Sequence, residues 1–113
     1  MAKLRRYCGP ALLDIDGRYI REYCGKALYE VDGKYVKEYC GRTLFEIDGK
    51  YIRRYCGPIL LEVDNGKIRR YCGPTIYEYS MGKIREYCGM NLYEIDGFVS
   101  NAQLMALFAI LFA

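Results

Sequence analysis

Apolar and polar residues alternate along most of this chain within a sixteen-residue block, whose consensus is Y-C-G-x-x-L-Y-E-I-D-G-K-Y-I-R-E. The block begins at Tyr7, Tyr23, Tyr39, Tyr55, Tyr71 and Tyr87. Self-similarity at a fixed period indicates a repeat architecture. Residues 3–7 match residues 67–71, so the chain opens in the second half of a block, and the pattern ends after Gly97.

Two turn signals, Asp-Gly and Cys-Gly, divide each block. Asp-Gly between alternating residues favours a two-residue type I′ hairpin, because both central positions of that turn have positive φ. Cys-Gly is a weaker signal of the same kind. The runs between the turns are rich in Tyr, Ile, Val and Leu, which favour strands. Each block therefore predicts one β-hairpin with six-residue strands.

This spacing predicts twelve antiparallel strands in one meander. One set of strands is expected at residues 10–15, 26–31, 42–47, 58–63, 74–79 and 90–95. The other set is expected at residues 2–7, 18–23, 34–39, 50–55, 66–71 and 82–87. The opening half-block is the natural partner of the last strand, so the meander can close and remove its two exposed edges.

Side chains on alternate faces of each strand separate into an aliphatic set and a charged set. We expect the aliphatic set inside, since Lys67 and Lys83 take the place of tyrosines in the charged set. The expected core residues are Leu13, Tyr29, Phe45, Leu61, Tyr77, Tyr93, Ile15, Val31, Ile47, Val63, Tyr79 and Ile95, with partners Leu4, Ile20, Val36, Ile52, Ile68 and Ile84. Acids and bases of the outer set can pair diagonally between strands.

The segment after Gly97, FVSNAQLMALFAILFA, breaks the pattern and carries no charge. Ser100 or Asn101 is a plausible N-cap, and helix-forming residues follow. A membrane-spanning helix needs about 20 apolar residues, so this one is short. At roughly 20 Å it matches the height of a six-residue strand. We therefore expect one domain, with residues 1–97 as a β ring and residues 98–113 as a helix through its axis. A membrane tail, or a helix that docks on a partner, is the alternative.

How the ring closes stays open at this point. A barrel requires strand tilt and a net stagger, which two-residue turns alone do not give. Bulged turns could supply the stagger, and the glycine shifts by one residue in Asp64-Asn65-Gly66 and in Ser80-Met81-Gly82. Otherwise, the hairpins stand as radial petals around the helix.

This layout of twelve antiparallel strands and an apolar C-terminal helix resembles the tubby, phospholipid-scramblase and LURP-one-related fold. The short hairpin repeats also resemble the small bacterial "beta flower" proteins. Both resemblances cover the whole chain in layout and rest on strand count and tail, without a shared motif. A tubby-like relationship implies phosphoinositide binding through surface basic residues, but no position here matches those residues. The chain is also shorter and more regular than those families.

Composition argues against several classes of function. With 17 basic and 14 acidic residues the net charge is +3, too balanced for a dedicated nucleic-acid binder. There is no histidine, the serines are Ser80 and Ser100, and there is no Gly-rich phosphate loop. The carboxylates repeat along a surface stripe, unlike a local active site. We expect a non-enzyme without cofactor, metal or small-molecule substrate. The N-terminus shows no apolar signal segment, which predicts a cytoplasmic protein.

The cysteines occupy equivalent points and should ring one rim: Cys8, Cys24, Cys40, Cys56, Cys72 and Cys88. Equivalent residues of successive hairpins lie two strands apart, about 9–10 Å, whereas a disulfide needs Cα atoms about 4.4–6.8 Å apart. Zinc sites usually show Cys-x₂₋₄-Cys pairs or histidines, which this chain lacks. We expect the cysteines to be turn residues copied with the repeat. A metal or redox ring is the alternative.

Three blocks carry two adjacent arginines where other blocks carry a base and an acid. These candidate anionic-surface contacts are Arg5, Arg6, Arg53, Arg54, Arg69 and Arg70. A solvated surface of mixed charge is the simpler interpretation. Overall we expect a structural or interaction module, acting on an unknown protein partner or on itself. The alternative is a membrane-surface or anionic-lipid-binding protein that uses the basic pairs, the apolar tail or both.

Overall fold

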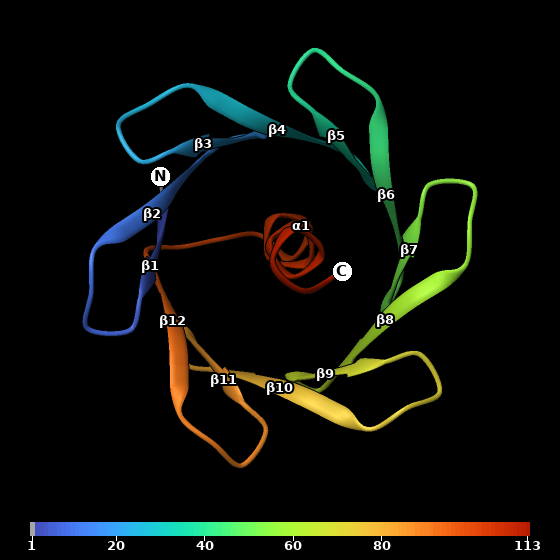
Figure 1. Ribbon diagram of the computed structural model, residues 1–113. Helices are drawn as coiled ribbons and strands as arrows, with labels where there is room; N and C mark the ends of the chain where they lie inside the picture. Colours follow the sequence, from blue (N-terminus) through green and yellow to red (C-terminus); the bar gives the residue numbers. More distant parts are fainter. Residues whose placement is uncertain (1) are drawn as a thin grey trace.

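Twelve antiparallel strands close into a barrel around a single C-terminal helix in the computed structural model, which describes residues 2–113 (Figure 1). The strands are β1 Ala2–Arg6, β2 Ala11–Asp16, β3 Tyr19–Glu22, β4 Ala27–Asp32, β5 Tyr35–Glu38, β6 Thr43–Asp48, β7 Tyr51–Arg54, β8 Ile59–Asp64, β9 Lys67–Arg70, β10 Thr75–Ser80, β11 Lys83–Glu86 and β12 Asn91–Asp96. The helix is α1, Asn101–Phe112. Every strand pairs with its neighbours in sequence, and β1 pairs with β12, as the repeat predicts.

The turns at one end of the barrel, here called the narrow rim, are two-residue turns displaced by one residue from the prediction. Asp16 pairs with Tyr19, so the turn consists of Gly17 and Arg18 rather than Asp-Gly. Positive φ falls on Gly17 (60°) alone, which fits a type II′ turn. In the turn between β8 and β9, both Asn65 (54°) and Gly66 (78°) have positive φ, which fits a type I′ turn. The shifted glycine therefore changes the turn type and leaves the turn length unchanged.

The Cys-Gly turns form the opposite end, the flared rim, and they also differ from the prediction. The Gly9 amide donates to the Arg6 carbonyl at 2.9 Å, and the Arg6 amide donates to the Pro10 carbonyl at 3.2 Å. These bonds enclose three residues, and positive φ falls on Cys8 (56°) instead of on the glycine. Glycine is needed for close approach: a Cβ on Gly25 would lie 2.9 Å from the Cβ of Glu22.

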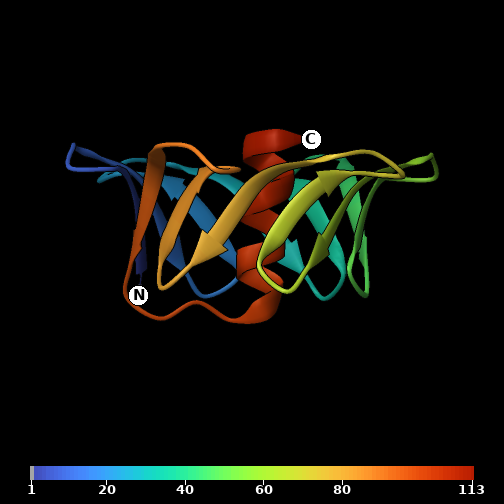
Figure 2. The ribbon, with the colours of Figure 1, turned by 90° about the horizontal axis from the view of Figure 1, so that it is seen from below.

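The stagger that closes the barrel comes from bulges inside the strands. In the hairpin of β1 and β2, Leu4 pairs with Leu13 but Arg5 pairs with Ala11, so Leu12 is the extra residue. The same shift occurs in the other five hairpins whose turns form the flared rim, at Leu28, Leu44, Leu60, Ile76 and Leu92. Beyond the bulges the hairpins bend away from the axis as petals (Figures 1 and 2). The two arrangements left open by the sequence are therefore both present, a closed barrel with radial petals.

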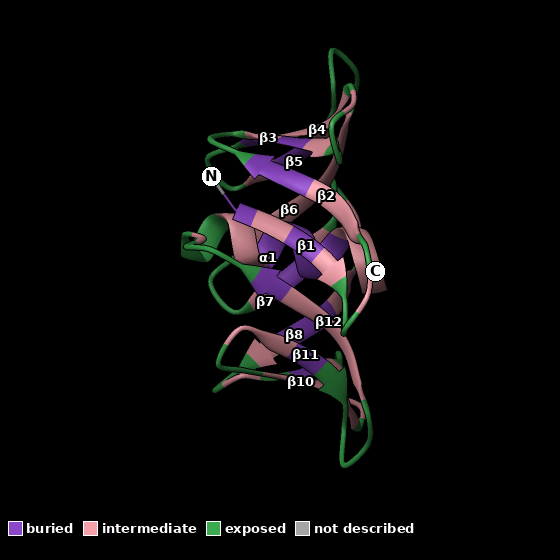
Figure 3. Ribbon diagram, turned by 90° about the vertical axis from the view of Figure 1, so that its left-hand side faces the viewer, coloured by how far each residue is buried: buried purple, intermediate pink, exposed green. Residues whose placement is uncertain are grey.

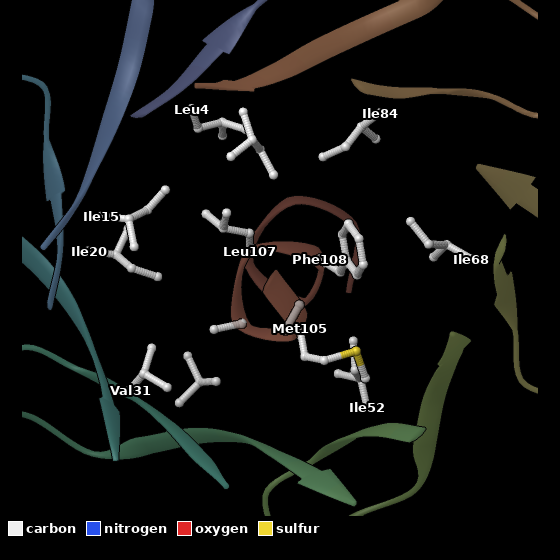
Figure 4. Packing of buried hydrophobic residues seen from close by; sticks show 14 of the residues in the cluster. Leu4, Ile15, Ile20, Val31, Ile52, Ile68, Ile84, Met105, Leu107 and Phe108 are labelled. Atoms are coloured by element: carbon white, nitrogen blue, oxygen red, sulfur yellow. The ribbon is translucent and has the colours of Figure 1, made fainter. Parts of the chain in front are cut away.

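The predicted aliphatic set faces inward and packs on the helix. Leu4, Ile20, Val36, Ile52, Ile68 and Ile84 are each 0% exposed. Burial is concentrated in the middle of the strands and helix, while both rims are exposed (Figure 3). Helix residues 105–109 are buried among these strands (Figure 4). The molecule is a disc of 36 × 35 × 17 Å.

The predicted helix lies on the axis and begins with a capping box at Ser100. The Ser100 hydroxyl accepts from the Gln103 amide at 3.2 Å, and the Gln103 side-chain oxygen accepts from the Ser100 amide at 2.9 Å. The Gln103 side chain also donates to the Gly17 carbonyl at 2.5 Å, which ties the start of the helix to the β2–β3 turn. Across residues 2–113, no helix has the length and apolar character needed to cross a membrane.

Candidate interaction surface at the flared rim

The flared rim presents six copies of the same exposed turn. The tyrosine of each turn is between 41% (Tyr7) and 50% (Tyr39) exposed, and all six cysteines are exposed. The helix ends at the centre of this rim (Figure 2). There Phe112 stacks on Tyr77. The rim therefore displays aromatic side chains and thiols at regular intervals around the partly buried apolar end of the helix.

Each petal tip is held in a strained conformation. The cysteines have φ between 53° and 57°, a left-handed conformation that costs a non-glycine residue roughly 1–2 kcal/mol. The glycine that follows fixes the tip through its hydrogen bond to the residue before the tyrosine, as Gly57 does to Arg54 at 2.8 Å. The tyrosine and cysteine side chains are thus presented outward by a defined backbone rather than by a loose loop.

The cysteine of a petal also acts on the tyrosine beside it. The charge of the Cys56 thiolate form, and then its hydrogen bond, raise the pKa of Tyr55, with smaller contributions from Tyr35 and burial. Cys72 acts in the same way to raise the pKa of Tyr71. A phenol with the ordinary pKa of about 10 is already neutral at physiological pH and can donate a hydrogen bond, and the shift moves ionisation of Tyr55 and Tyr71 further from that pH.

The petals fall into two kinds by charge. Three read Arg-Tyr-Cys-Gly-Pro, with Arg6, Arg54 and Arg70 before the tyrosine, and the other three have glutamate there. In one acidic petal the charge is offset locally, because Arg42 pairs with Glu38 at 3.8 Å. The arginine petals have no such acid within the turn. Positive charge therefore concentrates on the neighbouring petals of β7–β8 and β9–β10.

The predicted basic pairs separate into paired and unpaired members. Arg5 lies 3.7 Å from Glu94 and 3.9 Å from Asp96 on the outer wall, and Arg69 lies 3.1 Å from Glu62. Arg53 donates to the Gly57 carbonyl at 3.3 Å. The second member of each pair is exposed and forms no ion pair within 4.0 Å among the described residues: Arg6, Arg54 and Arg70.

Ring closure brings only two of the three pairs together. The petals with Arg54 and Arg70 are adjacent, whereas the petal of β11–β12, with Glu86, lies between Arg70 and Arg6. The whole β11–β12 hairpin therefore separates Arg6 from Arg70, whereas Arg54 and Arg70 stand on neighbouring petals.

Tyrosine pairs on the outer wall were missed by the sequence reasoning. Edge-to-face contacts join Tyr19 to Tyr39, and Tyr51 to Tyr71, each with ring centroids 5.8 Å apart. A third contact joins Tyr35 to Tyr55 at 5.9 Å. All three link positions twenty residues apart, a spacing that could have been read from the repeat. Half of the wall is therefore aromatic, and the other half has lysines at the same positions, Lys3, Lys67 and Lys83.

The most buried carboxylate, Glu62, forms two ion pairs across the wall. Glu62 is 5% exposed and lies 3.2 Å from the Lys50 ammonium and 3.1 Å from the Arg69 guanidinium. Burial alone raises the pKa of Glu62, but the hydrogen bonds and charges of Lys50 and Arg69 outweigh it and lower that pKa overall. Glu62 is therefore ionised at neutral pH. Its two ion pairs connect β8 to Lys50 in the β6–β7 turn and to Arg69 on β9.

The six thiols are separate from one another on their petals. Among residues 2–113 no cysteine is bridged, and no three His, Cys, Asp or Glu side chains gather as a metal site would require. Each thiol is instead an individual exposed group beside its tyrosine.

Comparison with known proteins identifies no relative of this chain. No family model, curated protein or solved structure matches the chain. The closed barrel of repeated hairpins thus stands on the structure, and the tubby-like and "beta flower" resemblances stay predictions.

Proposed function

We propose that this chain is a non-enzymatic interaction module whose contact surface is the flared rim. The observation that carries the proposal is the set of six half-exposed tyrosines, presented by strained turns around the end of the helix (Figure 2). Tyrosine offers a large rigid contact area with a polar end, and it is enriched at protein interfaces. Supporting the same view, the apolar helix is used inside the barrel and is not a free tail.

A protein, or a second copy of this chain, is the partner that this rim fits. Arginine and tyrosine are the residues most enriched at interface hot spots, and the flared rim carries both on adjacent petals. Six equivalent tips also allow a partner to contact several petals at once, which strengthens binding without new types of contact.

Thiol protection tests this proposal directly, because each petal has a cysteine beside its tyrosine. The tagged full-length chain is isolated with its bound proteins, and alkylation of each cysteine by N-ethylmaleimide is followed by mass spectrometry, beside the free chain. We expect slower alkylation of rim cysteines in the complex. Oxidation of Met81, 95% exposed on the narrow rim, is the control and should be unchanged. Protection at Met81 with none at the cysteines would contradict the proposal.

A second candidate function is contact with an anionic membrane surface, favoured by the adjacent exposed Arg54 and Arg70. Each basic residue near such a surface contributes about 1 kcal/mol. Flotation with anionic and neutral vesicles tests it, using the double variant Arg54→Gln/Arg70→Gln. The control Arg6→Gln/Arg42→Gln removes the same charge from other petals of the same rim. Equal flotation of both variants, or flotation with neutral vesicles, contradicts a specific basic sector.

A further inference from the structure

The barrel has a hollow between its helix and its wall at the narrow rim. The helix is tied to the β2–β3 turn by the bond from Gln103 to the Gly17 carbonyl. The β8–β9 turn, with Asn65 and Gly66, lies on the opposite side of the ring (Figure 1). There a cavity of about 290 Å³ remains between α1 and the wall. The cavity therefore lies across the ring from the contact between Gln103 and Gly17.

The walls of this cavity are apolar, and its mouth is polar. Val63, Tyr79, Leu104, Met105 and Phe108 supply the apolar lining. Figure 4 shows Met105 and Phe108 directed to the side of the wall formed by Ile52 and Ile68, with Leu107 directed the other way. Asn65 and Asn101, both exposed, stand at the mouth.

Burial of the wall residues points to the same place independently. Among the equivalent inward positions, Ile15, Val31 and Ile95 are at most 7% exposed. Ile47, Val63 and Tyr79, on three successive hairpins, are only partly buried, and Val63 and Tyr79 line the cavity. These side chains lack the cover that the helix gives their counterparts across the ring.

The repeat pattern also changes at the cavity. Tyr79 stands where the other hairpins have Ile or Val, and its ring meets Phe108 edge to face at 5.8 Å. Asn65 stands where the first three hairpins have glycine. A second hollow, about 190 Å³ beside Gln103, is lined by Val31, Ala102 and turn residues and has no aromatic wall.

We propose that this cavity binds a small, neutral aromatic molecule with one hydrogen-bonding group directed to the mouth. Its volume is about twice the ~150 Å³ of an apolar cavity that holds benzene, and so it suits a bicyclic ring. The lining offers an edge-to-face aromatic corner for such a ring. Lys50 is the charged residue of the lining, and its ammonium already pairs with Glu62 at 3.2 Å, which disfavours an ionised ligand in the cavity. This inference does not depend on the function proposed for the flared rim.

Indole is the probe that tests the proposal, by ¹H–¹⁵N NMR titration of the full chain. We expect saturable shifts of the Gly49 and Gly66 amides, with a dissociation constant on the order of 1 mM or below. The Gly17 and Gly33 amides, at equivalent turns away from the cavity, should hold still. Absence of saturable shifts, or equal shifts at all four turns, overturns the proposal.

Matched variants locate the site. Val63→Phe fills the cavity and should weaken indole binding at least tenfold, while Val31→Phe, at the equivalent position of β4, should leave it unchanged. Circular dichroism establishes that each variant is folded. If either variant is unfolded, Val63→Leu and Val31→Leu are used instead. Val63→Leu should then weaken indole binding, and Val31→Leu should leave it unchanged. Binding that survives in the folded Val63 variants overturns the assignment.

Discussion

The ring of Tyr77 on β10 stacks on that of Phe112 in the last turn of α1, with centroids 3.9 Å apart and planes 18° apart. This contact joins the end of the helix to the wall at the flared rim. At the level of the preceding turn Phe108 meets Tyr79. Strand β10 is thus the wall's main aromatic contact with the helix, and it carries tyrosine at the two inward positions that face these phenylalanines.

Removing the Phe112 ring should destabilise the fold. Because Phe112 is partly buried, we expect Phe112→Ala to lower the free energy of unfolding by about 1–3 kcal/mol, less than for a fully buried phenylalanine. Denaturant unfolding measures it. Phe98→Ala is the control: Phe98 is 87% exposed, so the change should stay within about 0.5 kcal/mol. Equal effects of the two would mean that the stack contributes nothing.

Ending the chain after Gly97 should unfold or aggregate the ring. Truncation removes Met105–Ala109, which are buried among the inward side chains of the strands, and leaves that aliphatic surface exposed to water. Circular dichroism and size-exclusion chromatography provide the test. A truncated chain that stays monomeric with native strand content would show that the wall is stable alone.

The strained petal tips predict a stabilising substitution. Cys88 has φ of 57°, so Cys88→Gly should raise the free energy of unfolding by about 0.5–1 kcal/mol. Cys88→Ala keeps the Cβ and the strain, and should change stability little. Chemical denaturation of the three proteins separates relief of strain from loss of the thiol. If alanine stabilised as much as glycine, the backbone would not be the cause.

Two glycines of the narrow rim should differ in their tolerance of alanine. A Cβ on Gly66 would lie 2.6 Å from the Tyr79 carbonyl oxygen, whereas a Cβ on Gly49 meets nothing within 4 Å. Both have positive φ, so both substitutions carry strain. We expect Gly49→Ala to cost about 1 kcal/mol and Gly66→Ala about 2 kcal/mol more, because backbone must also shift. Thermal unfolding that ranks them in reverse order would contradict this account.

Stability should depend on pH through Glu62. Its pKa is lowered in the folded state, so its contribution is present above the ordinary glutamate pKa of about 4.3. As the pH falls through the lower folded pKa, protonation removes that contribution. We therefore expect Glu62→Gln to be destabilising at pH 7 and nearly neutral at pH 2, in denaturant unfolding at both values.

A comparison separates this effect from ordinary ion pairing. Among residues 2–113, Glu46 forms an ion pair with Lys34 alone, at 3.4 Å, so Glu46→Gln should destabilise less at pH 7 than Glu62→Gln. A Glu62→Gln effect that was the same at both pH values would exclude ionisation as its source.

Much of this fold can be predicted because each hairpin repeats the same evidence. Alternation placed Ile20 and its equivalents inside, and the matched lengths of strand and tail placed the helix on the axis. The sequence did not predict which residue of each turn has a positive φ. Cysteine is not a residue expected there, and glycine next to it serves close approach instead. The bulge at Leu12 was also hidden, since its sequence is the same as that of a regular strand.

The candidate surfaces were less predictable than the fold. Adjacent arginines in the sequence indicated positive charge. Because successive side chains of a strand point in opposite directions, Arg69 pairs with Glu62 whereas Arg70 is exposed. The cavity lies between α1 and the wall of β8 and β10. A periodic pattern places equivalent residues around the ring, but it does not show against which of them the helix packs less closely.

The register shift of one residue in every flared hairpin means that total stagger grows in proportion to the number of hairpins. Strand tilt depends on the ratio of stagger to strand number, so rings of five or seven hairpins would obey the same local rules. The number of blocks in the chain sets the ring at six hairpins. The helix matches that size, because a smaller wall would not admit its side chains and a larger one would leave them uncovered. The C-terminal segment is thus fitted to one ring size, and a block could not be added or removed without a different helix.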